Sequence, residues 1–590
     1  MEWVAGADFV APNLPEPVGD MSPLLPQSNR GALRASPLRR LLASHPNRQF
    51  VDYVCDGAEC GFHLGVMEND DSYFLDNLGS ATEFQEYVDE YFEAEIGAGR
   101  MAGPFAEPVH PRSRVNPSGT APKKSYEPGV VKRRTIGHLS AGPGGDRSRS
   151  LNALTVADVS VVFASAADAV QVLQQYGAGA FLAKCDIRAA YRQLAIRPEL
   201  VHLLGLSWRG GIYYDLRLPF GSSAGPAIFQ AVSNAVVFAA QQRVNGSIGN
   251  DRCTVLSLLD DFLVVGRDEE ACAAGFEALL WTLAEVGLEV AGEKTEGPRK
   301  QLEFLGLALC TSDGQICMGI PEDKRLDLLR QLKLIAGSRK VTKWQLLHTA
   351  GKLGFADCVI PFGRPYTSCM FARAHRGGYV PGHFVSVSRE LRADAEVWCR
   401  LLESGPVSRR LDLALPTEPT IRVHGDASGT IGFGFFLTNT QTEVAWCDRW
   451  SEPWLQQQLG ALKEKDSSTV RESVAMGVAL ETVPTVPGDV FLYHTDNEAL
   501  VQAVQRGRSA NRGINNVLRR MALFAAEKGL HVACCWRRRS HPAQVAADLL
   551  SRIDRQGFRG SRWARGIRTR FGTPTSLAGR VRTSLQWPNV

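Results

Sequence analysis

The stretch VLSLLDDFLVVG at residues 255–266 places two adjacent carboxylates, Asp260 and Asp261, between two apolar runs. Such a pattern predicts two β-strands joined by an acidic turn. Because hard divalent cations bind carboxylate oxygens held on a rigid backbone, the paired acids are candidates for a cation site. Aspartate is also a common turn residue, so a solvated acidic turn is the alternative that the rest of the chain must decide.

Length and composition predict a globular protein of several domains. The chain has 590 residues, of which 44% are hydrophobic and 22% are charged. No apolar run is long enough to span a bilayer, and residues 1–20 lack the basic and apolar regions of a signal peptide. We therefore expect an intracellular protein, cytoplasmic or nuclear or both, with no membrane partner. The 13 cysteines follow no repeating frame and are typical of reduced thiols. Cys55, Cys60 and His63 cluster locally but lack a fourth ligand at zinc-site spacing.

The net charge of +4 is too small to indicate nucleic-acid binding by itself. Basic residues do gather in clusters at Lys123-Lys124, Lys132–Arg134, Arg537–Arg539 and the tail from Arg552 to Arg582. A nucleic-acid surface and an ordinary solvated surface are both compatible with these clusters.

Residues 1–45 are rich in Pro, Ser and Ala, which predicts a disordered leader. The spacing of apolar residues at 81–92 predicts an amphipathic helix. Strand-like and helical patterns then alternate, as in a mixed α/β domain. The strand expected at 180–187 contains Asp186 near its end, and a glycine-rich turn at 221–225 precedes a helix that Pro226 can start.

Five motifs in this order resemble the series found in the palm of reverse transcriptases. They are Asp186 with Tyr191 five residues later, LPFGSSAGPAIFQ at 218–230, LLDD at 258–261, Lys294, and FLG at 304–306. The resemblance implies a right-hand polymerase with fingers, palm and thumb. It also implies that Asp186, Asp260 and Asp261 hold two Mg²⁺ or Mn²⁺ ions for phosphoryl transfer.

The same resemblance assigns the substrate contacts. Tyr191 would be the steric gate against the nucleotide 2′ hydroxyl, with a core tyrosine as the alternative. Arg134, or Lys132 as second choice, would bind the triphosphate, and Phe220 and Gly221 would line the substrate site. Lys294 would donate a proton to pyrophosphate, with a solvated loop lysine as the alternative. The chain departs from the retroviral pattern at three positions, which leaves nucleotide preference and fidelity open: His138 replaces an acid, Phe220 a glutamine and Leu258 a tyrosine.

A second acidic set follows a helical segment at 321–415, which the resemblance implies is the thumb and connection. Asp426, Glu472, Asp496 and Asp548 fall on an expected strand, helix, strand and helix, in the order of the ribonuclease H active site. The resemblance implies that these four acids hold two metal ions that activate water against RNA. His541 would assist proton transfer or product release, with a loop histidine as the alternative.

We therefore expect an α/β and α+β multidomain chain. It would begin with a disordered leader at 1–45 and an N-terminal extension at 46–125, followed by the fingers and palm at 126–320. The thumb and connection at 321–415, a ribonuclease H-like mixed-sheet domain at 416–553 and a basic tail at 554–590 would complete it. The phrases at 61–105 and Arg539–Asp548 resemble the DIRS-like group of retrotransposons, which implies a separately encoded tyrosine recombinase as partner. The implied activity is RNA-directed DNA synthesis with hybrid cleavage, and the partners are an RNA template, a DNA primer, an RNA:DNA hybrid and deoxynucleoside triphosphates. The alternatives are an inert, domesticated nucleic-acid-binding scaffold and a hybrid nuclease with an inert polymerase domain.

Overall fold

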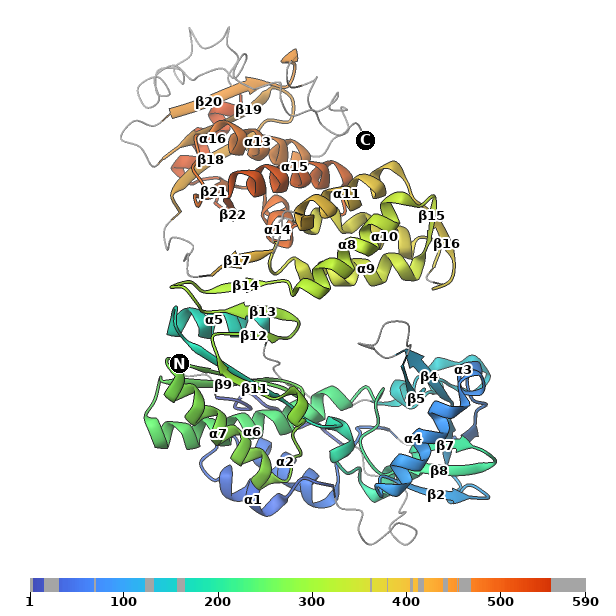
Figure 1. Cartoon of the computed structure of the whole chain (residues 1–590). Helices are drawn as coiled ribbons and strands as arrows, with labels where there is room; N and C mark the ends of the chain where they lie inside the picture. Colours follow the sequence, from blue (N-terminus) through green and yellow to red (C-terminus); the bar gives the residue numbers. More distant parts are fainter. Residues whose placement is uncertain are drawn as a thin grey trace, which may run out of the picture. The chain divides into compact units, whose positions relative to one another are not determined.

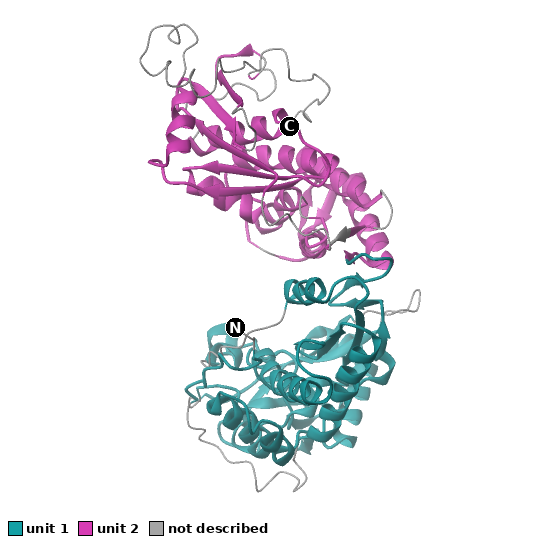
Figure 2. Ribbon diagram, turned by 90° about the vertical axis from the view of Figure 1, so that its left-hand side faces the viewer, with its two compact units in different colours: residues 1–316 teal, residues 317–590 magenta. Residues whose placement is uncertain are grey.

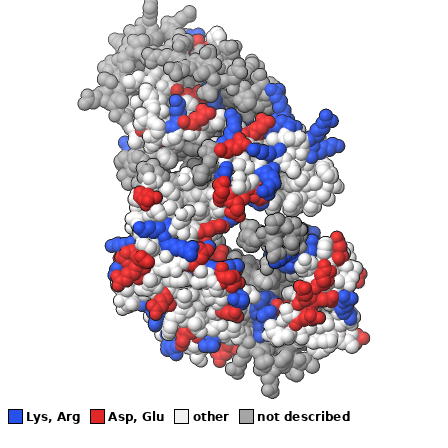
Figure 3. Space-filling view, in the orientation of Figure 1, with Lys and Arg blue, Asp and Glu red and all other residues white. Residues whose placement is uncertain are grey.

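The computed structural model describes residues 4–14, 31–67, 71–122, 132–155, 165–360, 363–378, 380–403, 407–411, 419–438, 444–453, 455 and 468–552. The chain divides into two compact units, residues 1–316 and 317–590 (Figure 2). Each unit has a hydrophobic core of its own. Among the described residues, no helix has both the length and the apolar character that a bilayer crossing requires. Figure 3 shows acidic and basic side chains interspersed on the visible face of each unit.

The first unit is built around a four-stranded sheet with the order β11-β6-β10-β9. Figure 1 labels its strands β9 and β11. Its strands are β6 (Phe181–Asp186), β9 (Cys253–Leu258), β10 (Asp261–Gly266) and β11 (Glu296–Arg299). Residues 262–266 of β10 are all buried, because helix α7 (Glu269–Val286) packs on this strand and on β6. The acidic hairpin expected at 255–266 is confirmed.

Helix α6 (Gly225–Ile248) packs against α7 and β9 and carries the residues that reach the hairpin. Pro226 lies in its first turn, where the missing N–H costs no helical hydrogen bond. The helix is buried continuously from Ile228 to Ala240, so it is apolar on nearly every side rather than amphipathic.

The N-terminal region packs onto the same core. Helices α1 (Ala35–Leu41) and α2 (Arg48–Cys60) contact α7 and α6, and Leu33, Leu38 and Leu42 are buried. The expectation of a disordered leader is therefore wrong for residues 31–45. Leu38 within α1 and the flanking Leu33 and Leu42 are buried, and this short helix is stabilised because distant parts of the chain cover these leucines. Residues 15–30 lie outside the described residues.

A second sheet in this unit has the order β1-β3-β7-β8-β2, and a separate hairpin pairs β4 with β5. The strands are β1 (Tyr73–Phe74), β2 (Met101–Phe105), β3 (Arg114–Asn116), β4 (Ser118–Pro122), β5 (Arg133–Gly137), β7 (Gly205–Trp208) and β8 (Gly211–Asp215). The helix expected at 81–92 is divided at Phe84 into α3 (Gly79–Glu83) and α4 (Gln85–Gly97), because Phe84 has non-helical backbone angles. The remaining elements of the unit are α5 (Ala166–Tyr176), β12 (Gln301–Phe304) and β13 (Leu307–Cys310).

The second unit begins with a helical segment. Its elements are β14 (Cys317–Gly319), α8 (Glu322–Gly337), β15 (Lys340–Thr342), α9 (Lys343–Ala356), α10 (Ser368–His375), β16 (Phe384–Ser386), α11 (Arg389–Glu403) and β17 (Ser408–Arg410). Helices α8 and α11 pack side by side, and β14 pairs with β17. Buried Leu328, Leu332 and Trp398 form part of their contact.

A five-stranded sheet with the order β20-β19-β18-β21-β22 completes the second unit. Its strands are β18 (Ile421–Ala427), β19 (Gly432–Leu437), β20 (Val444–Arg449), β21 (Val490–Thr495) and β22 (His531–Trp536), and its helices are α13 (Ser468–Thr482), α14 (Glu498–Arg506), α15 (Arg512–Lys528) and α16 (Pro542–Ser551). Strands β18, β21 and β22 are parallel, whereas β19 and β20 are antiparallel.

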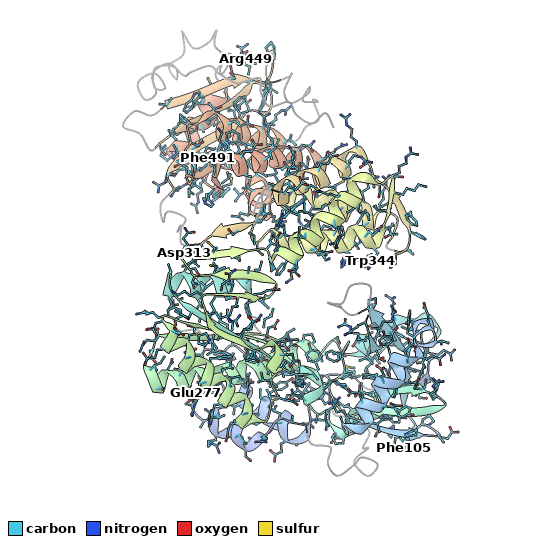
Figure 4. The ribbon with its side chains drawn as sticks, viewed as in Figure 1. Phe105, Glu277, Asp313, Trp344, Arg449 and Phe491 are labelled. Carbon is cyan, nitrogen blue, oxygen red and sulfur yellow. The ribbon has the colours of Figure 1, made fainter. Side chains whose placement is uncertain are left out.

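Strand alternation distributes the apolar side chains of this sheet between two cores. Phe433, Phe435 and Phe491 belong to the core that includes α13 and α15 residues, and Figure 4 labels Phe491 within the sheet. Phe436 belongs to the core formed with α16. Helices therefore cover both faces, and the carboxyl ends of the parallel strands meet at one edge.

Candidate active sites

Asp186 and Asp261 are directly opposed on the antiparallel strands β6 and β10. Because Leu258 pairs with Asp261, the two strands β9 and β10 are joined by the two-residue turn Leu259-Asp260. The structure thus brings Asp186, Asp260 and Asp261 to one end of the central sheet, as the sequence predicted.

The backbone of this turn is strained and is held by side chains of α6. Leu259 has a φ of 53°, in the left-handed region that favours glycine. Its N–H donates to Gln230 Oε1 at 2.7 Å, and its carbonyl accepts from Ser233 Oγ at 2.7 Å. The Asp260 carbonyl accepts from the Ile187 N–H at 3.2 Å. These bonds fix the position of the acids, since each neighbouring backbone group of the turn has a partner.

The three acids repel one another. Burial, together with the charges of Asp260 and Asp186, raises the pKa of Asp261 to about 6. Burial also raises the pKa of Asp260. Lys294 Nζ lies 2.9 Å from Asp186 Oδ2, and this hydrogen bond raises the pKa of the lysine. The lysine amine is therefore in direct contact with one of the three carboxylates, that of Asp186. The donor set consists of carboxylate oxygens with excess negative charge, which suits divalent Mg²⁺ or Mn²⁺.

Tyr191 lies in the short 3-10 helix η5 (Ala190–Gln193) beside the acids. Its ring stacks on Phe220, with centroids 5.3 Å apart, and contacts Phe229 at 5.4 Å. A Cβ at Gly225 would come within 3.1 Å of the Tyr191 ring, so only glycine allows the ring this position without a shift. The tyrosine is half-buried and packs against the hydrophobic core of the first unit, with one ring face covered by Phe220.

Asn152 fixes the turn that carries Phe220 and Gly221. Its Nδ2 donates to the Gly221 carbonyl at 2.8 Å, and its Oδ1 accepts from the Ser223 N–H at 2.9 Å. Gly221 has a φ of 93°, which a side chain would oppose. Phe220 is 50% exposed, so its ring lies at the surface.

The hairpin of β4 and β5 separates its basic residues by face. Arg133 lies 3.7 Å from the Phe84 ring centroid and donates to Thr120 Oγ1 at 2.8 Å, and Thr135 donates to the Tyr87 carbonyl at 3.0 Å. By strand alternation, Lys132 and Arg134 point to the opposite face, where both are exposed. Lys123 and Lys124 lie outside the described residues.

A second acidic cluster lies at the carboxyl edge of the sheet in the second unit. Ligand oxygens of Asp426, Glu472 and Asp496 all lie within 4.8 Å of one another. Among the described residues this is the one group of three potential ligands that meets that spacing. The ligand atoms of Asp186, Asp260 and Asp261 do not come that close together, and Cys55, Cys60 and His63 do not form such a group either. Burial and the neighbouring acids raise the pKa of Glu472 well above its usual value, and burial raises that of Asp426. Two buried carboxylates and one half-buried carboxylate that repel one another suit a divalent cation.

Polar neighbours orient this cluster. Ser551 Oγ donates to Asp426 Oδ2 at 2.7 Å, and Glu472 accepts from the Ala427 N–H at 3.3 Å. Asp548 lies outside the group of three and pairs with Arg552 at 2.8 Å. Its charge still contributes to raising the pKa of Asp426. Arg539 lies 3.5 Å from Asp548 and 3.7 Å from Asp496.

His541 begins α16, where its Nδ1 accepts the Ala543 N–H at 3.2 Å. Its ring is parallel to that of His424, with centroids 6.3 Å apart, and His424 stacks on His494 at 4.5 Å. Burial lowers the pKa of His494 to about 4. His541 thus has a helix-capping role that the sequence did not indicate.

Sequence reasoning missed the residues that support the acids, among them Gln230, Ser233, Asn152 and Ser551. Gln230 was part of a quoted motif, but its type gave no sign of a bond to a turn 29 positions away. The usable signal was a polar residue in an otherwise apolar helix, because a buried amide requires partners.

Comparison with known proteins agrees with the first site. Residues 145–309 match the family model described as reverse transcriptase (RNA-dependent DNA polymerase). Similar proteins are the retrovirus-related Pol polyproteins from transposons opus and 297 of Drosophila melanogaster, 26% identical over 166 residues and 24% over 199 residues. These matches cover 28% and 34% of this chain and 15% and 16% of those polyproteins. Residues 145–309 therefore match the reverse transcriptase domain found in retrotransposon and retroviral Pol polyproteins.

Two solved structures are also similar. One is the foamy viral protease-reverse transcriptase dRH in complex with double-stranded DNA. The other is the foamy viral protease-reverse transcriptase in complex with an RNA/DNA hybrid. The TM-scores are 0.43 and 0.42, each at 13% identity. The alignments cover 85% and 86% of this chain and 81% and 63% of those chains.

Proposed function

We propose that the protein is an RNA-directed DNA polymerase that copies retroelement RNA into DNA. The observation that carries this proposal is the placement of Asp186, Asp260 and Asp261 at one end of the central sheet, within residues that match the reverse transcriptase family. The chain spans only about 15% of the curated relatives it matches, so the activity is inferred from the site.

Each residue of the site has a chemical task in this proposal. Asp186, Asp260 and Asp261 would hold two divalent ions, which, when bound, would activate the primer 3′ hydroxyl and stabilise the leaving pyrophosphate. Lys294 would transfer a proton to the departing pyrophosphate. Arg134, with Lys132 beside it, would bind the triphosphate, and Tyr191 on Phe220 and Gly221 would face the sugar.

Helix α9 in the helical segment supports a nucleic-acid partner. Trp344, His348, Gly351 and Phe355 recur at helical spacing along one face, and all are exposed. Trp344 is 52% exposed and stacks on His348 with centroids 4.7 Å apart, and Figure 4 labels it on this segment. Aromatic rings flanking a glycine present a flat surface with room for close approach, as expected of a thumb that grips a duplex by shape.

We propose a second activity for residues 416–553, ribonuclease H cleavage of the RNA strand of an RNA:DNA hybrid. The specific observation in its favour is the close group of Asp426, Glu472 and Asp496 at the carboxyl edge of a mixed sheet. Asp548 would complete the site, and His541 would assist proton transfer or product release.

Two assays test these activities. The purified protein should extend oligo(dT) on poly(rA) with deoxynucleotides in Mg²⁺ or Mn²⁺, and it should cleave the RNA of a labelled hybrid. Hybrid binding with neither activity would support the inert scaffold instead, and cleavage without synthesis would support a nuclease with an inert polymerase domain.

Within this function we propose fingers and palm at 126–320, preceded by an extension from residue 46, a thumb and connection at 321–415, and a basic tail at 554–590. We also propose the DIRS-like subgroup and a cytoplasmic or nuclear site of action. A tyrosine recombinase encoded beside this gene would support the subgroup, and a neighbouring integrase with a zinc-binding domain would contradict it.

A further inference from the structure

A buried cluster of charged residues lies behind Tyr191. Arg192 Nη2 donates to Glu95 Oε2 at 2.7 Å and to Asp215 Oδ1 at 2.5 Å, and its Nε donates to Glu95 Oε2 at 3.0 Å. Arg100 donates two further bonds to Glu95, each of 2.8 Å. The side chains of Arg192, Glu95 and Asp215 are only 3%, 9% and 4% exposed. The cluster joins α4, β8 and the short helix η5.

Arg192 directly follows Tyr191, so the cluster anchors the segment that carries the proposed gate. The next residue, Gln193, is also held, because its Nε2 donates to the Glu289 carbonyl at 3.0 Å and its Oε1 accepts from the Glu289 N–H at 2.8 Å. Ala189, just before η5, has a φ of 49°. A four-residue 3-10 helix preceded by a strained residue has little intrinsic stability, so these side-chain bonds determine its position.

Burial makes the arginine an effective anchor. Burial opposes its charge, but the charges of Asp215 and Glu95 outweigh this effect and raise the pKa of Arg192. Neutralising Glu95 would leave Arg192 with one carboxylate partner, Asp215, and would remove the charged partner of Arg100, so the balance of buried charge would change and the segment would shift. Tyr191, adjacent in the chain, would move with it. Rejection of a single hydroxyl requires the ring to be placed to within a fraction of an ångström.

We propose that Glu95 and Arg192 are positioning residues that set the selectivity for deoxyribonucleoside over ribonucleoside triphosphates by fixing Tyr191 against the sugar. This inference rests on the proposed polymerase function. It assigns a role in substrate choice to α4, which lies ahead of the part of the chain that matches the reverse transcriptase family.

The test is Glu95→Gln, with the kcat/KM ratio for dGTP and GTP measured opposite a template cytosine. These two substrates differ only in the 2′ hydroxyl. We expect the ratio to fall by about fivefold or more, because coupled neighbouring residues commonly interact at this level. If Glu95→Gln fails to fold, Arg192→Lys serves in its place, since lysine keeps the charge but loses the fork of bonds.

A second background separates positioning from stability. In Tyr191→Ala the gate is already absent, so adding Glu95→Gln should leave the dGTP/GTP ratio unchanged. The matched control is Glu481→Gln, which breaks the partly buried ion pair with Arg520 in the second unit and should leave the ratio of the wild type unchanged.

Each outcome decides a claim. If Glu95→Gln is active and its dGTP/GTP ratio of kcat/KM equals that of the wild type, this inference alone is overturned. It is also overturned if Glu95→Gln lowers that ratio as much in the Tyr191→Ala background as in the wild type. Wild-type protein that incorporates neither nucleotide overturns the proposed polymerase function and the inference with it.

Discussion

Asp186 and Asp261 face each other as register partners on adjacent antiparallel strands, with Asp260 beside them in the turn. Partial burial of like charges is unfavourable without a cation, and the pKa of Asp261 is accordingly raised to about 6. The three acids therefore reduce the stability of the metal-free fold, and a bound divalent cation would relieve their repulsion.

The first prediction is that Asp261→Asn stabilises the protein in EDTA. The folded-state pKa of Asp261 exceeds its unfolded value, so the protonated form stabilises the fold at low pH and this stability is lost as pH rises through about 6. At pH 8 we expect the variant to raise Tm by about 2–4 °C, and below pH ~4 the difference should vanish. Thermal melting with and without Mg²⁺ measures this, and the ion should stabilise the wild type more. A lower Tm of the variant at pH 8 would contradict the account.

The second prediction concerns the support of the strained turn. Gln230→Ala removes the acceptor of the Leu259 N–H, so kcat for synthesis should fall about 10-fold or more while the fold is retained. The control is Gln241→Ala on the same helix. Gln241 makes the same kinds of bonds to Cys253 and Val255 at the other end of β9, far from the acids. Equal losses of kcat in both variants would mean that the effect is general destabilisation.

Local patterns in the sequence predicted the strands and the order of the acids, because an apolar run ending in aspartate needs no knowledge of distant residues. The contacts between residues that are distant in the sequence were not predicted. The bond from Gln230 to Leu259, the positive φ of that leucine and the pair of Arg192 with Glu95 all depend on packing. Asp548 shows the same limit, because it pairs with Arg552 and does not belong to the close group formed by the other three acids.

The third prediction concerns Arg519, which joins α15 to the helical segment of the second unit. Its guanidinium lies 2.6 Å from Asp394 and 2.9 Å from Glu390, with only 11% of the side chain exposed. Burial raises the pKa of Asp394 to about 7. Arg519→Ala should destabilise this unit by about 3 kcal/mol, because it leaves a buried carboxylate without its partner.

Urea unfolding and hydrogen exchange of α11 measure this effect. The control is Arg512→Ala on the same helix, whose side chain is 70% exposed and lies 3.7 Å from Glu390. We expect that exposed pair to contribute less than about 1 kcal/mol. Unaltered exchange of α11 in Arg519→Ala would refute the role of the arginine.

The fourth prediction separates the two proposed sites. Asp496→Asn removes one carboxylate of the close group in the second unit, so hybrid cleavage should fall at least about 100-fold while primer extension is retained. Asp489→Asn is the control, since Asp489 precedes the same strand and its carboxylate accepts the nearby Val486 N–H at 2.7 Å. Parallel loss of synthesis in Asp496→Asn would argue against two independent sites.

The most direct test of the central claim is primer extension on poly(rA)/oligo(dT) by Asp260→Asn. The acid lies in the turn between β9 and β10, and its loss should reduce extension at least about 1,000-fold with Mg²⁺ or Mn²⁺, while the protein still folds and binds the primer-template. Asp251→Asn, an exposed position just before β9, should extend at the wild-type rate. Extension by Asp260→Asn at a rate near that of Asp251→Asn would contradict the assignment of the hairpin as the polymerase active site.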